Sequence, residues 1–136
     1  MSTKHWTIVA FLTMTVGASL TAHHSFTAEF DVTKPVTLTG SVTKVEWGNP
    51  HIWVYLDVKD EGGILRSWQC EGGAPNTLTR HGWSKDSLKF NDRITVDGWL
   101  AKDGSKTCNL RVITLPDGRS VFAGSSGGDN PTPPKP

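Results

Sequence analysis

Two adjacent histidines, His23 and His24, are the residues of this chain with the clearest potential for specific chemistry. They follow Ala22, which ends an apolar run preceded by Lys4, and this layout is typical of a secretory signal peptide. Cleavage after Ala22 would make His23 the first residue of the mature protein. Its α-amine and two imidazoles would then lie within a few bonds of each other, and nitrogen ligands of this kind suit Cu(II) or Ni(II) in a tetragonal arrangement.

A third nitrogen ligand would make such a metal site much stronger. His51 is the natural candidate because it begins a predicted strand directly after the turn Trp47-Gly48-Asn49-Pro50. His81, near the end of a predicted helix, is a weaker one. We therefore expect the metal ligands to be His23, His24 and His51, with copper as the metal. A zinc enzyme is disfavoured, because the chain has no HExxH or similarly spaced motif.

Three alternatives bear on this metal hypothesis. The two histidines beside the cleavage site would carry no chemistry if they belonged to a solvated arm. A cut after Ala18 instead of Ala22 would place them inside a longer arm, and an uncleaved apolar segment would act as an anchor.

The composition of the chain predicts where the protein is located and how the chain is divided. Export predicts a periplasmic or secreted location. The apolar segment is too short and too early for a confident membrane span, so no span is expected after cleavage. The expected organisation is a signal peptide (1–22), a polar N-terminal arm (23–35), a strand-bearing domain (36–123) and a Gly/Pro tail that cannot bury apolar surface (124–136).

Apolar residues alternate with period two through the strand-bearing domain, which is typical of half-buried strands. A change of phase near Thr43 and Lys44 predicts a β-bulge. Pro75 and Gly82 suit the two ends of a short helix. The predicted strands cover 36–47, 51–59, 64–71, 93–101, 107–115 and 119–123. This predicts an all-β fold, a small five- to six-stranded OB-like barrel with one short helix between strands three and four. An open sandwich or another small barrel would give a similar pattern.

Cys70 and Cys108 lie in the apolar phase of the third and fifth predicted strands. These strands are neighbours in an OB-like barrel, and the expected compartment is oxidising, so a disulfide between the two cysteines is reasonable. Two separate buried thiols are the alternative. If the cysteines pair, no free thiol nucleophile remains.

Aromatic side chains alternate away from the aliphatic face of the predicted sheet at Trp53, Tyr55 and Trp99. OB-folds commonly bind extended ligands over the face of strands two and three, and exposed rings there could stack on a sugar or a small aromatic ligand. The alternative is that the N-terminal arm folds over these rings, with Phe26 and Phe30 packed against them.

The charge pattern argues against nucleic acid as a partner, because the formal net charge is +1 and no block of basic residues appears. No Ser-His-Asp or Cys-His arrangement stands out in the sequence. We therefore expect a non-catalytic binding or accessory protein whose partner is a small ligand, a metal or another periplasmic protein.

Three segments together resemble domain of unknown function 6152, a family of small exported bacterial proteins. They are HHSFTAEFD at 23–31, PVTLTG at 35–40 and WGNPH at 47–51. The resemblance continues to about Gly124 and implies secretion, a mature start at His23 and a β-barrel. It implies no activity, so metal binding remains an inference from the residues.

Overall fold

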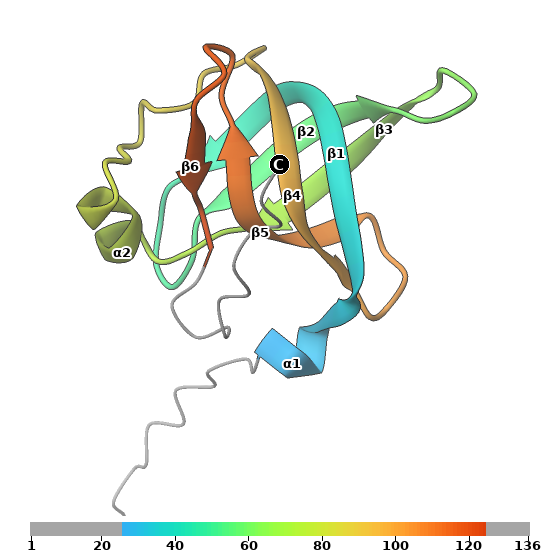
Figure 1. The fold of residues 1–136 in the computed structure, drawn as a ribbon, viewed down its shortest axis with the longest axis horizontal. Coiled ribbons are helices and arrows are strands. Elements are labelled where there is room, and N and C mark those ends of the chain that lie inside the picture. Colours follow the sequence, from blue (N-terminus) through green and yellow to red (C-terminus); the bar gives the residue numbers. More distant parts are fainter. Residues whose placement is uncertain (1–25, 125–136) are drawn as a thin grey trace, which may run out of the picture.

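The structure is a computed structural model that describes residues 26–124 (Figure 1). The elements of this part of the chain are α1 (Phe26–Glu29), β1 (Phe30–Glu46), β2 (Trp53–Lys59), β3 (Leu65–Glu71), α2 (Pro75–Arg80), β4 (Arg93–Ala101), β5 (Thr107–Thr114) and β6 (Ser120–Phe122). The strands form one sheet in the order β3-β2-β1-β4-β5-β6. A parallel pairing of β3 with β5 closes β1 to β5 into a ring, which confirms the predicted all-β, barrel-like fold.

The long strand β1 holds this ring together because it pairs with two partners. Its first part is antiparallel to β4 and its second part is antiparallel to β2. The register with β2 shifts between Val42 and Lys44, which confirms the predicted bulge at Thr43. Gly40 lies where the strand passes between both partners, and a Cβ there would be 2.4 Å from the Asp57 carbonyl oxygen. Only glycine permits that approach.

Strand β1 begins six residues earlier than the predicted start at Val36. Phe30 and Asp31 pair with Ala101 and Leu100 of β4, and the register then shifts before Pro35. The segment between them, Val32 to Lys34, is too short and too exposed to show the alternation that indicates a strand. The arm predicted over residues 23–35 is therefore part of the barrel from Phe30 onward.

Strand β2 begins at Trp53 and not at His51, because the chain before it bonds elsewhere. The Ile52 amide donates to the Gly73 carbonyl at 3.1 Å, and the Gly72 amide donates to the Ile52 carbonyl at 2.9 Å. Ile52 is fully buried by this arrangement. His51 thus lies at the edge of the ladder, next to the end of β3.

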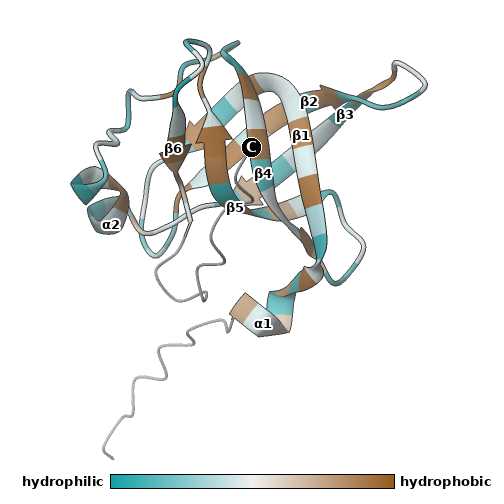
Figure 2. Cartoon of the chain, viewed as in Figure 1, coloured by the Kyte–Doolittle hydropathy of each residue, from teal (hydrophilic) through white to brown (hydrophobic). Residues whose placement is uncertain are grey.

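The core fills the interior of the ring with aliphatic side chains. Figure 2 shows hydrophobic residues recurring along the barrel strands. The fully buried strand residues are Val54, Leu56, Val96, Leu110 and Ile113. Cys70 and Cys108 are also fully buried, face each other in the β3–β5 register and form a disulfide, as predicted.

Helix α2 closes one side of the barrel and matches the predicted position. Pro75 occupies its first turn, where a missing amide proton costs nothing. Gly82 follows the helix with φ +86°, a conformation that favours glycine after a helix end. The Trp83 indole then donates to the Phe122 carbonyl at 2.9 Å and ties this corner to β6. Among residues 26–124, no helix is long and apolar enough to cross a bilayer.

Candidate functional site

Four side chains form a row across the outer face of the barrel. Trp53 is the register partner of Glu71, Glu71 of Asn109, and Asn109 of Trp99. The row therefore crosses β2, β3, β5 and β4, with neighbouring strands about 4.8 Å apart. Glu71 and Asn109 are only 8% and 4% exposed although they point away from the core. Two nearly buried polar side chains thus lie between two tryptophan side chains in this row.

His51 lies two residues before Trp53 and contacts Glu71 of this row. Its Nδ1 forms a close contact with Oε1 of Glu71, and the two side chains are 31% and 11% exposed. Because Nδ1 carries the proton that faces the carboxylate, Nε2 of a neutral His51 is left with a lone pair. A histidine held by a carboxylate in this way is typical of metal ligands, whose second ring nitrogen is oriented by such a partner.

The predicted metal ligands cannot all be placed. His23 and His24 lie outside the described residues. Within residues 26–124, no three His, Cys, Asp or Glu side chains are grouped so that they could hold a metal. His81 caps the end of α2 and packs edge-on against the Phe122 ring, with centroids 5.3 Å apart. A metal at His51 would need ligands from the segment before Phe26.

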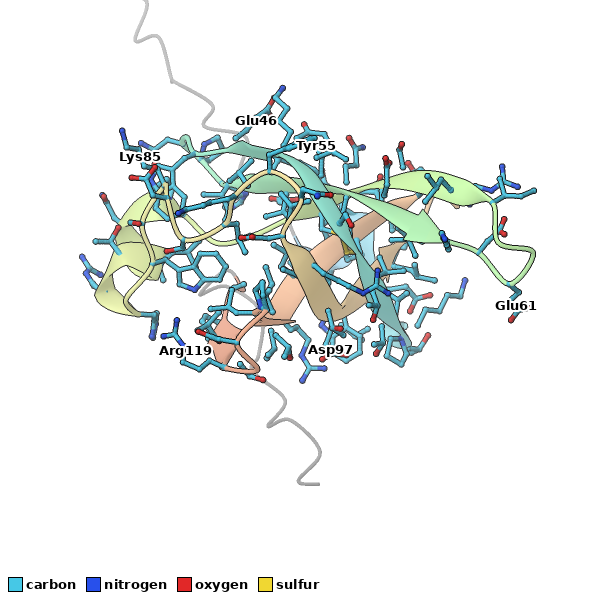
Figure 3. The ribbon with its side chains drawn as sticks, turned by 90° about the horizontal axis from the view of Figure 1, so that it is seen from above. Glu46, Tyr55, Glu61, Lys85, Asp97 and Arg119 are labelled. Atoms are coloured by element: carbon cyan, nitrogen blue, oxygen red, sulfur yellow. A yellow bond between two sulfur atoms is a disulfide. The ribbon has the colours of Figure 1, made fainter. Side chains whose placement is uncertain are left out.

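The predicted aromatic surface is divided into separate environments. The Tyr55 hydroxyl donates to Oε2 of Glu46 at 3.1 Å, and Lys44 Nζ lies 5.3 Å from the centre of its ring (Figure 3). Burial, followed by the contact with the Glu46 carboxylate, raises the pKa of Tyr55. Figure 3 shows Asp97, two residues before Trp99 on β4, on the opposite side of the barrel from Tyr55.

Trp99 is covered by a cation. The Arg111 guanidinium lies 4.6 Å from the centre of the Trp99 ring, a cation–π arrangement. Arg111 also lines a cavity of about 580 Å³ formed by residues of β1, β4, β5 and β6, where the Thr37 hydroxyl donates to Asp97 at 2.6 Å. This cavity was not predicted from the sequence.

Trp53 borders a cavity of about 590 Å³ between α1, β2, β3 and the β4–β5 loop. Its lining comprises Ala28, Glu29, Phe30, Trp53, Gln69, Ala101, Lys102, Asp103, Ser105 and Thr107. Helix α1 is fixed beside it by Lys102, whose amide donates to the Glu29 carbonyl at 2.8 Å and whose ammonium donates to the Thr27 carbonyl at 2.5 Å. The cavity is therefore bordered by α1, by strands of the barrel and by the β4–β5 loop.

The N-terminal segment contributes to this cavity without closing it. Phe30 is 4% exposed and forms one wall, and the ring of Phe26 lies 5.6 Å from that of Phe30. Trp53 and Tyr55 both remain half-buried. The described part of the arm thus supports Phe30 as a wall and does not cover the predicted binding rings.

Asn109 and Thr107 were not predicted from the sequence as members of the site. Each lies in the polar phase of its strand, which normally indicates solvent exposure. Their burial follows from neighbours on other strands and has no local signal in the sequence.

The chain is similar in sequence to one family of proteins. The model of a family described as "Family of unknown function (DUF6152)" matches residues 11–110. No curated protein matches the chain. The matched segment includes β1 to β4 and all four residues of the row formed by Trp53, Glu71, Asn109 and Trp99.

Proposed function

Because the chain belongs to the family of unknown function DUF6152, its role has to be inferred from its own residues, and we propose that it is an exported, non-catalytic protein that binds copper. The proposed ligands are His51, His23 and His24. The role would be storage, delivery or protection of the metal, without turnover.

The contact between His51 and Glu71 is the observation that carries this proposal. It holds the imidazole in one orientation and assigns the proton to Nδ1. Nε2 is then the nitrogen with a lone pair, and a side chain that is 31% exposed can be reached from outside. A neutral, oriented imidazole is the form that binds Cu(II).

The position of α1 supports a contribution from His23 and His24. Phe26 is three residues after His23, and three extended residues span at most about 11 Å. Phe30 and Trp53 line the same cavity, and Trp53 is two residues from His51.

The disulfide supports export. Cys70 and Cys108 are bonded and fully buried, and structural disulfides of this kind persist in oxidising compartments. The signal-peptide pattern at residues 1–22 points to the same compartment. Cleavage after Ala22 would provide the α-amine of His23 as a further nitrogen ligand.

Titration of the protein that begins at His23 with Cu(II), against a competing chelator, tests the proposal. We expect one tight equivalent of copper, and weaker binding in His51→Ala and in the double variant His23→Ala, His24→Ala. His81→Ala is the matched control, because that histidine packs against Phe122 and should bind no metal. Equal affinity in all of these proteins would refute the copper site.

A second candidate function is favoured by the cavity beside α1. Its volume of about 590 Å³ lies within the usual range of ligand pockets, and Trp53 supplies an aromatic wall. We propose that this part of the outer face binds a small ligand. Of the three aromatic residues predicted for such a surface, Trp53 borders this cavity, whereas Tyr55 and Trp99 lie in other environments.

A further inference from the structure

The cavity beside α1 contains three polar side chains that are hydrogen-bonded to one another, those of Gln69, Ser105 and Thr107. Gln69 Nε2 donates to the Thr107 hydroxyl oxygen at 3.0 Å, and the Ser105 hydroxyl donates to the same oxygen at 2.8 Å. A hydroxyl accepts two hydrogen bonds and donates one. The Thr107 hydroxyl is therefore held in position by two neighbouring side chains.

Thr107 is only 8% exposed, so this hydroxyl lies almost entirely out of bulk solvent. Thr107 is one of the residues that line the cavity. A nearly buried donor fixed from two sides is a preorganised contact for a ligand oxygen.

Other side chains of the lining provide further hydrogen-bond donors and acceptors. Gln69 keeps its side-chain carbonyl and one N–H beyond the bond to Thr107. Asp103 accepts the Ser105 amide with Oδ1, which leaves Oδ2 as an acceptor within the described residues. Phe30 and Trp53 provide apolar walls. The cavity thus combines an aromatic surface with closely spaced donors and acceptors.

The charge of the cavity argues against an anionic ligand. Its one cationic side chain among the described residues, Lys102, already donates to the Thr27 carbonyl. Asp103 and Glu29 add negative charge to the lining. A phosphate or a nucleic-acid backbone would need clustered cations instead.

We infer that the cavity binds one neutral sugar unit, with the apolar face of its ring on Trp53 and its hydroxyls on Thr107, Gln69 and Asp103. Adjacent sugar hydroxyls each donate and accept, which matches a lining that contains both donors and acceptors. This inference rests on the proposed ligand-binding role of the cavity and does not depend on copper.

Titration of the protein that begins at His23 with glucose, mannose, N-acetylglucosamine and their short oligomers tests the inference by calorimetry and tryptophan fluorescence. We expect saturable binding of at least one of these sugars. Trp53→Ala and Thr107→Val should each weaken it by about tenfold or more. Thr107→Ser keeps the hydroxyl and should restore most of the affinity, even if the valine variant folds poorly.

Trp99→Ala is the matched control, because Trp99 lies on the outer face but does not line this cavity. It should change the affinity by less than about twofold. Unchanged sugar binding in Trp53→Ala would overturn the inference. Binding of indole or benzoate at Trp53 with no sugar bound would show that the ligand class is wrong but the pocket is real. No binding of either class would refute both proposals.

Discussion

The imidazole of His51 is held by the carboxylate of Glu71, across the ends of β2 and β3. This relationship joins a residue just before β2 to the last residue of β3, and it assigns the two imidazole nitrogens different roles. Nδ1 faces the carboxylate, and Nε2 is available to a metal. The proposed copper site depends on this orientation.

Replacement of the carboxylate tests that dependence. Glu71→Gln keeps the size of the side chain but removes the negative charge that faces Nδ1 of His51. We expect Cu(II) affinity to fall by roughly 10- to 100-fold, the usual effect of losing the group that orients a metal-bound histidine. The measurement is a competition titration, with thermal unfolding to check the fold. Asp117→Asn, a change in the exposed turn before β6, should leave copper affinity unaltered.

Reduction of the disulfide should destabilise the barrel. Cys70 and Cys108 are 38 residues apart, and closing a loop of this length stabilises a fold by about 4 kcal/mol in the chain-entropy treatment. The bond also joins β3 to β5, the pairing that closes the ring. Urea unfolding with and without reductant measures the effect. An unchanged midpoint after complete reduction would contradict this role.

We expect that no side chain can be accommodated at position 98 of β4, which is occupied by glycine. A Cβ at Gly98 would lie 2.0 Å from the Asn109 carbonyl oxygen, so β4 and β5 would have to move apart. We expect Gly98→Ala to lower the free energy of unfolding by about 1–3 kcal/mol or to prevent folding. Gly48→Ala is the control, since a Cβ there meets nothing within 4 Å. Equal stability of the two variants in urea would show that the approach of β4 to β5 is wrong.

The turn between β2 and β3 should lose stability in acid through Asp60. Hydrogen bonds from the Ile64 amide, the Arg66 side chain and the Gly62 amide lower the pKa of Asp60 below its ordinary value of 3.8. A carboxyl group whose pKa is lower in the folded than in the unfolded state stabilises the fold at pH values above its unfolded pKa. This stabilisation is lost as the pH falls through the folded pKa. Asp60→Asn should therefore reduce the melting temperature at neutral pH, and the difference should shrink as the pH falls below about 4.

Asp86→Asn provides the comparison for this pH experiment. Asp86 is exposed, and its carboxylate accepts no hydrogen bond among residues 26–124. Its melting temperature should follow that of the unmodified protein over the whole range. If Asp60→Asn also follows it, the carboxylate does not stabilise the turn.

Most of the barrel was predictable because its elements have local signals. Period-two alternation located β4 exactly at Arg93–Ala101, and the phase change at Thr43 located the bulge. Pro75 and Gly82 marked the ends of α2. The start of β1 at Phe30 was missed because it depends on pairing with Ala101, which is far away in the sequence.

The candidate site was less predictable, because its members are assembled from different strands. His51 was identified from its place after a turn, but its contact with Glu71 depends on the β2–β3 register. The burial of Asn109 depends on the parallel pairing of β5 with β3. Alternation placed Trp53 and Tyr55 on one face correctly, but it could not show that only Trp53 borders a cavity.

The most direct test of copper binding is electron paramagnetic resonance of the protein that begins at His23, loaded with one equivalent of Cu(II). The account predicts a tetragonal spectrum with nitrogen couplings, and the loss of one coupled nitrogen in His51→Ala but not in His81→Ala. A spectrum that is identical in His51→Ala and the unmodified protein would contradict it, because copper would then be bound without the imidazole that Glu71 orients.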